Sequence, residues 1–288
     1  MRLVLLFFLL LTSLFAFDVK LSTDEVANGK TALIEFSSVR DVKLQKVVVG
    51  KKAFQIFAHP LDATTKYALI PMSYYEKRGS KKLTVEYLKG GKKEVTTLKL
   101  KVVSGEYAQE EIVVDAKKVN PKSKAVLKRI SQEYKEAMRI YGTITPKSYI
   151  KEPFILPLES KITSNFGKAR VYNGSLKGYH SGTDFRASMG TPIIAANDAK
   201  VALVKERFYS GGTVLLNHGE GIYTCYFHMS KFFVKEGEMV KRGDLLGLSG
   251  ASGRVTGPHL HFSARIAGVQ VDPLQLIKLI NTKLLQGN

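Results

Sequence analysis

Two short motifs in the last third of the chain combine residue types that bind metals. His180 and Asp184 lie in His-Ser-Gly-Thr-Asp, and His259 and His261 lie in Pro-His-Leu-His. Hydrolytic zinc sites use three nitrogen or oxygen ligands from the protein and keep a fourth position for water, whose pKa falls to about 7. Two imidazoles and one carboxylate supply such a set. The motifs therefore predict a catalytic zinc site and hydrolytic chemistry.

The spacing of His259 and His261 predicts a strand. Side chains two residues apart face the same way in extended backbone, whereas on a helix they point in directions roughly 200° apart. Apolar residues alternate with the two histidines, namely Leu260, Phe262 and Ala264. We expect one face of this strand to carry histidines and the other to be buried. The alternative is a pair of solvated histidines on an edge strand, which the upstream His-x-x-x-Asp disfavours.

The first 16 residues are typical of a secretory signal. A basic Arg2 precedes an apolar run, and small residues end it near Ala16. The sequence therefore predicts export to the periplasm or cell wall, with a membrane tether as the alternative if the segment is not cleaved. A single cysteine, Cys225, excludes an internal disulfide, and its apolar neighbours predict a buried structural thiol.

The formal net charge of +19 favours polyanionic surroundings. The lysines are scattered along the chain and no nucleic-acid motif accompanies them. For an exported protein we expect anionic envelope polymers as partners and no nucleic acid. The alternative is that these lysines only confer solubility.

Residues 17–105 predict a small β-sandwich-like domain, because short apolar runs alternate with turn residues. The predicted strands are 31–36, 44–49, 53–57, 83–88 and 95–100. Gly90-Gly91 separates the last two strands and predicts a hairpin. His59, which precedes Pro60, is expected in a loop.

Residues 106–150 predict a helical connector. Asn120-Pro121 is typical of a helix start. Apolar residues then recur at every fourth position up to Gly142, namely Val126, Ile130, Tyr134 and Met138. We expect this amphipathic helix to pack against one of the flanking domains.

Residues 151–288 predict a second domain. Short strands and glycine turns follow one another up to about residue 273, and residues 274–285 predict a short helix. The fold class expected for the whole chain is mainly β.

Residues 164–273 resemble the lysostaphin-like or LytM-type zinc metallopeptidases, which cut peptide bonds in bacterial peptidoglycan. The resemblance rests on several motifs in order: Ser164-Asn165-Phe166-Gly167, His180 to Asp184, Asn217-His218-Gly219, Tyr226-Phe227-His228, Lys241 to Asp244, and Gly257 to Phe262. It implies a LytM-like β-sheet peptidase domain that uses Zn²⁺ and acts on peptidoglycan stem peptides or cross-links in cell-wall remodelling.

The resemblance also assigns roles to individual residues. It implies that His180, Asp184 and His261 hold the zinc, and that His228 and His259 act on the water or on the tetrahedral oxyanion. Amide hydrolysis needs an activated water, a partner for the oxyanion and a proton donor for the amine, which this set supplies. His218 is predicted to be a turn residue.

Three further hypotheses concern roles other than catalysis. Some relatives keep this fold but regulate other wall hydrolases, so a non-catalytic scaffold or activator is the alternative function. Residues 17–105 could instead bind the cell wall. Families of this kind also often carry an amino-terminal segment that blocks the zinc groove. The third hypothesis is that the leading module of this chain does so.

Overall fold

A computed structural model describes residues 17–37, 39–174 and 176–286. The predicted signal, residues 1–16, lies outside the described residues. Strands dominate the described chain, which confirms the mainly β class. Within these ranges no helix is both long and apolar enough to cross a membrane.

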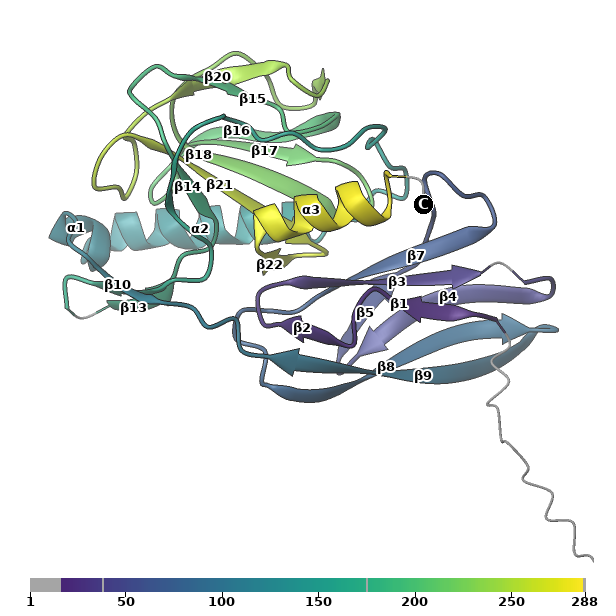
Figure 1. Cartoon of the computed structure of the whole chain (residues 1–288). Helices are drawn as coiled ribbons and strands as arrows, with labels where there is room; N and C mark the ends of the chain where they lie inside the picture. The colour runs from purple at the N-terminus through teal and green to yellow at the C-terminus, as the bar shows by residue number, and fades with distance from the viewer. Residues whose placement is uncertain (1–16, 38, 175, 287–288) are drawn as a thin grey trace, which may run out of the picture.

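Two sheets form the amino-terminal part, which Figure 1 shows in purple and blue. The first has the order β1 (Val19–Leu21), β3 (Thr31–Ser37), β7 (Thr65–Pro71) and β6 (Phe57–Ala58); the second has the order β2 (Glu25–Ala27), β9 (Lys92–Val103), β8 (Gly79–Lys89), β4 (Val42–Val49) and β5 (Lys52–Gln55). Apolar residues of both sheets share one buried cluster, including Ile34, Ile70, Val47 and Leu83. The two sheets therefore enclose a common core.

The hairpin predicted at Gly90-Gly91 is present. Lys89 pairs with Lys92, and both glycines have positive φ, as a two-residue turn of this kind requires. The single strand predicted at 53–57 is wrong, because the chain leaves one sheet after Gln55 and enters the other at Phe57. His59 follows this second short strand and lies in a loop, as predicted.

The connector contains β10 (Gln109–Ile112), α1 (Ala116–Val119) and α2 (Lys124–Tyr141). The helix start predicted at Asn120-Pro121 is wrong: the backbone N–H of Asn120 closes α1 on Ala116, and α2 begins only after Ser123. β10 pairs in parallel with β12 (Ala169–Tyr172), which pairs in turn with β13 (Leu176–Tyr179). The connector thus adds a strand to the carboxy-terminal part.

The buried face of α2 differs from the predicted stripe. Tyr134 is 65% exposed, and the buried positions are Glu133, Ala137 and Tyr141. Glu133 faces inward because its carboxylate accepts hydrogen bonds from Arg129 and from the backbone N–H of Phe208. A charged residue can thus occupy the packed face of a helix when its partners satisfy it.

The carboxy-terminal part is built on one large antiparallel sheet, green and yellow in Figure 1. Its main order is β11 (Ile162–Ser164), β14 (Thr183–Arg186), β21 (His259–Ile266), β18 (Ile222–Phe232), β17 (Gly211–Asn217), β16 (Ala199–Arg207) and β19 (Met239–Val240), with β15 (Pro192–Ile194), β20 (Leu245–Ser249) and β22 (Val269–Val271) attached.

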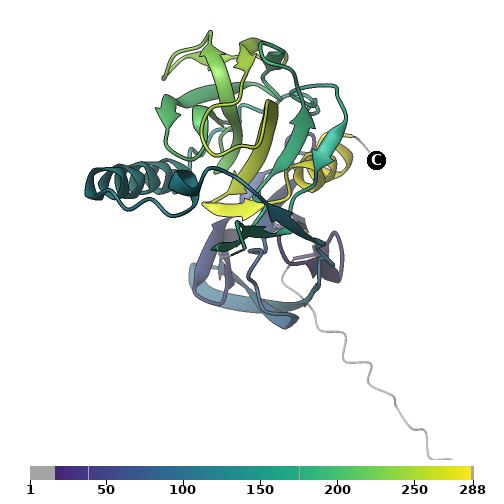
Figure 2. The same cartoon turned by 90° about the vertical axis from the view of Figure 1, so that its left-hand side faces the viewer.

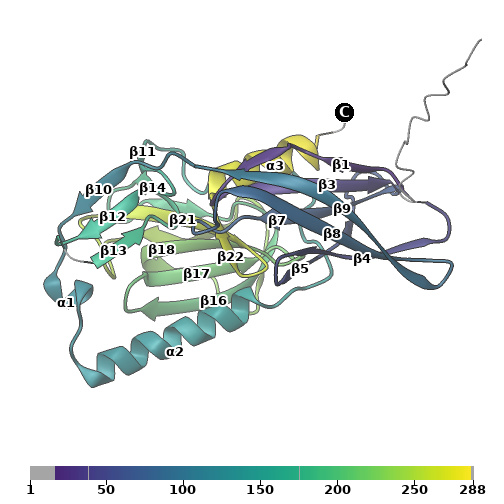
Figure 3. The same ribbon diagram turned by 90° about the horizontal axis from the view of Figure 1, so that it is seen from below.

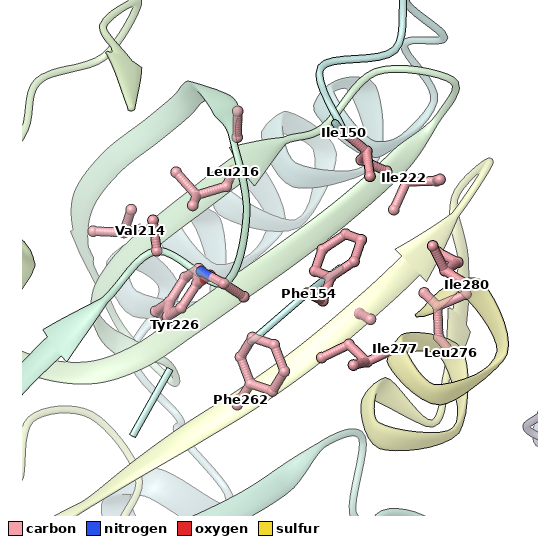
Figure 4. Packing of buried hydrophobic residues seen from close by; sticks show 14 of the residues in the cluster. Ile150, Phe154, Val214, Leu216, Ile222, Tyr226, Phe262, Leu276, Ile277 and Ile280 are labelled. Atoms are coloured by element: carbon pink, nitrogen blue, oxygen red, sulfur yellow. The ribbon is translucent and has the colours of Figure 1, made fainter. Parts of the chain in front are cut away.

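Helices cover the two faces of this sheet. Figure 2 shows α2 on one side and α3 (Pro273–Lys283) on the other. Figure 3 shows α2 running along β16, and its residues share a cluster with Leu203 and Tyr223. On the opposite face, α3 packs against strand residues such as Phe262 (Figure 4). A helix therefore covers part of each face of the sheet that carries the histidine motifs.

Polar and aromatic contacts join the two parts. The side-chain amide of Gln275 on α3 both donates to and accepts from the backbone of Thr31, each at 2.9 Å. Tyr74 stacks on Tyr179 with ring centroids 3.9 Å apart. These contacts tie the amino-terminal sheets to the segment that leads into His180.

One contact of this interface should depend on pH. Glu220 is buried, and its carboxylate accepts a hydrogen bond from the Tyr67 hydroxyl. Burial raises the pKa of Glu220 to about 7, against the lowering effect of its hydrogen bonds. The folded protein therefore binds the Glu220 proton more tightly than the unfolded chain does, and protonation of Glu220 stabilises the fold. This contribution, roughly 3 kcal/mol, is complete below pH about 4.5 and is lost as the pH rises through 7.

We expect Glu220→Gln to remove this pH dependence, because the neutral amide keeps an acceptor for Tyr67. The difference in melting temperature between the variant and the native protein should be small at pH 5 and should grow to several degrees in favour of the variant at pH 8. Glu236→Gln, at an exposed position, is the control. If the difference in melting temperature between Glu220→Gln and the native protein stayed the same from pH 5 to pH 8, the prediction would be contradicted.

Candidate metal site

Two neighbouring strands and the turn before one of them carry the three predicted metal ligands. β14 and β21 are antiparallel, with Asp184 directly opposite His261, so both side chains leave the same face of the sheet. His180 lies between β13 and β14 and is fully buried. The predicted strand of the His-x-His motif is confirmed as β21, and Leu260 and Phe262 are buried on its other face.

The three side chains bring one ligand atom each to a common point. His180 Nε2 is 2.9 Å from Asp184 Oδ1 and 3.0 Å from His261 Nδ1, and His261 Nδ1 is 2.8 Å from Asp184 Oδ1. A tetrahedral zinc ion with bonds of about 2.1 Å places its ligand atoms roughly 3.4 Å apart. The observed triangle is slightly smaller, so a small outward shift of the side chains accommodates the ion. Two imidazoles and one carboxylate also match the ligand chemistry of zinc.

Contacts behind the triangle fix the orientation of the two imidazoles. His180 donates from Nδ1 to the carbonyl of Asn165 at 2.8 Å, which leaves Nε2 as the ligand atom. The ring of His261 stacks on Phe227, with centroids 5.4 Å apart and planes 5° apart. Asn165 therefore serves the site through its backbone.

Arg170 and Glu110 belong to the site and were not predicted from the sequence. Arg170 donates to Asp184 Oδ2 at 3.2 Å and to Glu110 Oε1 at 2.6 Å. Lys168 also donates to Glu110. Burial raises the pKa of Glu110, but the two cations outweigh it and hold the pKa below its ordinary value. The pair holds the Asp184 carboxylate from the side opposite its ligand oxygen.

His228 and His259 lie beside the triangle. Each donates from Nδ1 to a backbone carbonyl at 2.8 Å, His228 to Ser252 and His259 to Gly257. Their ring centroids are 4.8 Å apart, and His259 Nε2 is 3.6 Å from Asp184 Oδ1. Both imidazoles therefore keep Nε2 for a proton or an oxyanion next to the metal position.

The backbone of His228 is left-handed, with φ of 66°. This conformation is rare outside glycine and costs about 1–3 kcal/mol. It occurs where the pairing of β18 changes register, and the backbone N–H of His228 donates to Ser210. The local distortion turns the imidazole toward His259 and His261, so the fold holds a strained residue at the site.

Burial sets the charge states of the site. It lowers the pKa of His228 well below its ordinary value, with further lowering by His259 and His261, and it lowers the pKa of His261 to about 4 against the effect of Asp184. Burial also raises the pKa of Asp184, but hydrogen bonds from His180 and His261 outweigh it and hold the pKa well below its ordinary value. At neutral pH, neutral imidazoles of His228 and His261 thus face an ionised carboxylate, as metal binding requires.

The site opens into a groove of about 500 Å³. Residues 110–114 of the connector line one part of it, and residues 254–259 before β21 line another. Among the described residues, none from 17–105 lines this groove. In this structure the leading sheets therefore do not block the groove. They could block it only if the two parts of the chain were placed differently relative to one another.

His218 lies apart from the site, at the end of β17. It is fully buried, donates from Nδ1 to the Asp198 carbonyl, and accepts from the Thr224 hydroxyl at 2.7 Å. Burial lowers its pKa to about 4. Both ring nitrogens are therefore occupied, and His218 is a structural residue that leads into a glycine turn.

Comparison with known proteins decides the family. Residues 178–273 match the sequence profile of Peptidase family M23. Residues 178–273 belong to peptidase family M23. The M23 match covers the region that carries His180, Asp184, His228, His259 and His261, so the candidate metal site lies within it.

Two relatives of the M23 region are named as peptidases. The peptidoglycan DD-endopeptidase ShyA of Vibrio cholerae is 40% identical over 122 residues, which cover 41% of this chain and 28% of ShyA. The DD-carboxypeptidase/endopeptidase Mpg of Neisseria meningitidis is 39% identical over 97 residues, which cover 34% of this chain and 22% of Mpg. The chain thus matches less than a third of the length of either relative.

A solved structure extends the likeness beyond the M23 domain. An M23-type protein from Pseudomonas aeruginosa has a TM-score of 0.66 and 26% identity, and the match covers 87% of this chain and 94% of that one. The common fold therefore includes much of the chain that precedes the M23 domain.

Proposed function

We propose that this protein is an exported zinc metallopeptidase that hydrolyses peptide bonds in peptidoglycan stem peptides or cross-links. The observation that carries the proposal is the convergence of His180, Asp184 and His261 on one point, with the free Nε2 atoms of His228 and His259 beside it, in an open groove. Each group that amide hydrolysis needs has a candidate within this one cluster.

The residues divide the chemistry among themselves. His180, Asp184 and His261 hold the zinc, which supplies an activated water and polarises the scissile carbonyl when bound. His228 and His259 hold or transfer a proton at Nε2, or stabilise the oxyanion. Arg170 and Glu110 keep the Asp184 carboxylate in place.

Relatives and charge support peptidoglycan as the substrate. ShyA is named as a peptidoglycan DD-endopeptidase, and Mpg is named as a DD-carboxypeptidase/endopeptidase. A net charge of +19 also suits the anionic polymers of the cell envelope. The signal-like residues 1–16 agree with action in the periplasm or wall.

The division of the chain into 17–105, 106–150 and 151–288 is part of this proposal. The separate core of the leading sheets supports the first boundary. The predicted connector does more than join the two domains, because its strand β10 lines the groove and carries Glu110. The alternative function, a non-catalytic scaffold, has no observation in its favour because the full set of predicted site residues is assembled.

A digest of defined muropeptides analysed by mass spectrometry tests the proposal. We expect the purified protein to release peptide products, to lose this activity after chelation, and to regain it when zinc is added. The masses of the products distinguish loss of a terminal residue from cleavage of a cross-link. An undiminished digest after chelation, or no product from any wall substrate, would reject the proposed function.

A further inference from the structure

Arg254 presents a positive charge to the groove of the metal site. It lies between β20 and β21 and lines the groove. Its guanidinium carbon is 4.4 Å from the ring centroid of Tyr172 and 4.6 Å from that of Tyr209. Contact with two aromatic rings restricts the side chain but does not neutralise it. The charge is therefore held in a defined place.

The guanidinium has no anionic partner in the described part of the chain. Arg170, which lines the same groove, is paired with Glu110 and Asp184. No such ion pair or side-chain hydrogen bond joins Arg254 to any described residue, so its N–H groups remain free. A planar, rigidly held guanidinium with free N–H groups is suited to bind a carboxylate through two hydrogen bonds.

Backbone contacts fix Arg254 relative to His228. The backbone N–H of Arg254 donates to the Tyr209 carbonyl at 2.8 Å. Two residues earlier, the carbonyl of Ser252 accepts from His228 Nδ1, and the Ser252 hydroxyl donates to Met229. Gly253, between them, has φ of 83° and packs against the Tyr209 carbonyl. One short tight loop therefore positions both the imidazole and the guanidinium.

We infer that Arg254 binds a free carboxylate of the substrate, on the residue whose amine is released by cleavage. This inference rests on the proposed function. In wall peptides cut between two D-centres, the carbon bonded to the departing nitrogen carries a free carboxylate, both in a terminal D-alanine and in a cross-linked diamino acid. His228 is one of two residues placed to give that nitrogen its proton, and Arg254 is tied to His228. Arg254 is thus a specificity residue for the leaving side of the bond.

Two cross-linked muropeptide dimers test the inference. They differ only at the carboxyl group beside the cross-linking amide, which is free in one and a carboxamide in the other. We expect the native protein to prefer the free carboxylate by roughly 10- to 100-fold in kcat/KM, as for other charge-assisted hydrogen bonds. Arg254→Gln should remove this preference by slowing only the free-carboxylate dimer. Arg254→Lys, which keeps the charge but not the planar fork, should restore part of it.

Arg186→Gln is the matched control, since Arg186 is an exposed cation that lines the same groove. It should leave the preference between the two dimers intact. Equal loss of preference in both variants would assign the effect to the general charge of the groove. Equal slowing of both dimers by Arg254→Gln would assign Arg254 a purely structural role. Either result overturns the inference.

The same dimers separate this inference from the proposed function. If the native protein cleaves neither dimer, the proposed function fails, and equilibrium binding of the two dimers then decides the role of Arg254. Tighter binding of the free-carboxylate dimer, lost in Arg254→Gln, supports a carboxylate site without catalysis. Equal binding of both dimers rejects it.

Discussion

Replacing His180 with alanine is expected to abolish both metal binding and peptide cleavage. His180 is fully buried and supplies one of the three atoms that converge at the proposed metal position, so alanine there leaves two of the three. Without the metal, the water keeps its ordinary pKa and the scissile carbonyl is not polarised. We expect kcat/KM to fall by on the order of 10³-fold or more. Metal content and muropeptide cleavage, measured on the same preparation, check this result.

His59→Ala is the control for this substitution, because His59 lies in a loop of the amino-terminal part, away from the groove. It should bind metal and cleave substrate as the native protein does. Circular dichroism should show that both variants keep the native β content. A His180→Ala protein with native metal content and native activity would show that this triangle is not the active centre.

Replacing His228 should separate catalysis from metal binding. We choose asparagine, because it tolerates the left-handed backbone of this position better than alanine does. His228→Asn removes an imidazole beside the triangle but none of its three ligand atoms. We expect native metal content and a fall in kcat of roughly 10²- to 10⁴-fold, which is typical for loss of a proton-transfer group. His259→Ala should behave in the same way.

Metal analysis and steady-state kinetics of both variants check this prediction. If a variant lost metal as well as activity, the replaced histidine would be a metal ligand rather than a proton-transfer group. Activity near the native level in both variants would remove the two histidines from the mechanism. If only one variant stayed active, the histidine that this variant retains would be the proton-transfer group.

Local spacing was sufficient to predict the centre of the site. The two-residue period of His259 and His261 predicted a strand with a histidine face, and that strand is β21. A strand period is a local property of the backbone, so a single sequence reveals it. The assembly of His180 and Asp184 with His261 followed from the family resemblance and is now seen as side-chain geometry.

Contacts between distant segments were beyond the reach of sequence patterns. Glu110 reaches Arg170 because β10 pairs in parallel with β12, and nothing in the local sequence of either strand specifies that partner. Arg254 was likewise not singled out, because its aromatic neighbours come from two other segments of the chain. The long-range pairing of the fold, rather than any motif, brings these charges to the groove.

The errors in the predicted elements have local causes. Asn120-Pro121 resembles a helix start, but Asn120 ends the short helix α1. Tyr134 fitted the apolar period of α2, yet Glu133 takes the buried position because Arg129 and Phe208 satisfy its carboxylate. The left-handed backbone of His228 had no sequence signal, since glycine is the usual marker of that conformation.

Anomalous X-ray scattering at the zinc absorption edge, from crystals of the protein purified with zinc, tests the central claim most directly. The account predicts one strong peak per chain, about 2.0–2.2 Å from His180 Nε2, Asp184 Oδ1 and His261 Nδ1. Crystals with zinc present but no peak among these three atoms, or with the peak bound by other residues, would contradict it.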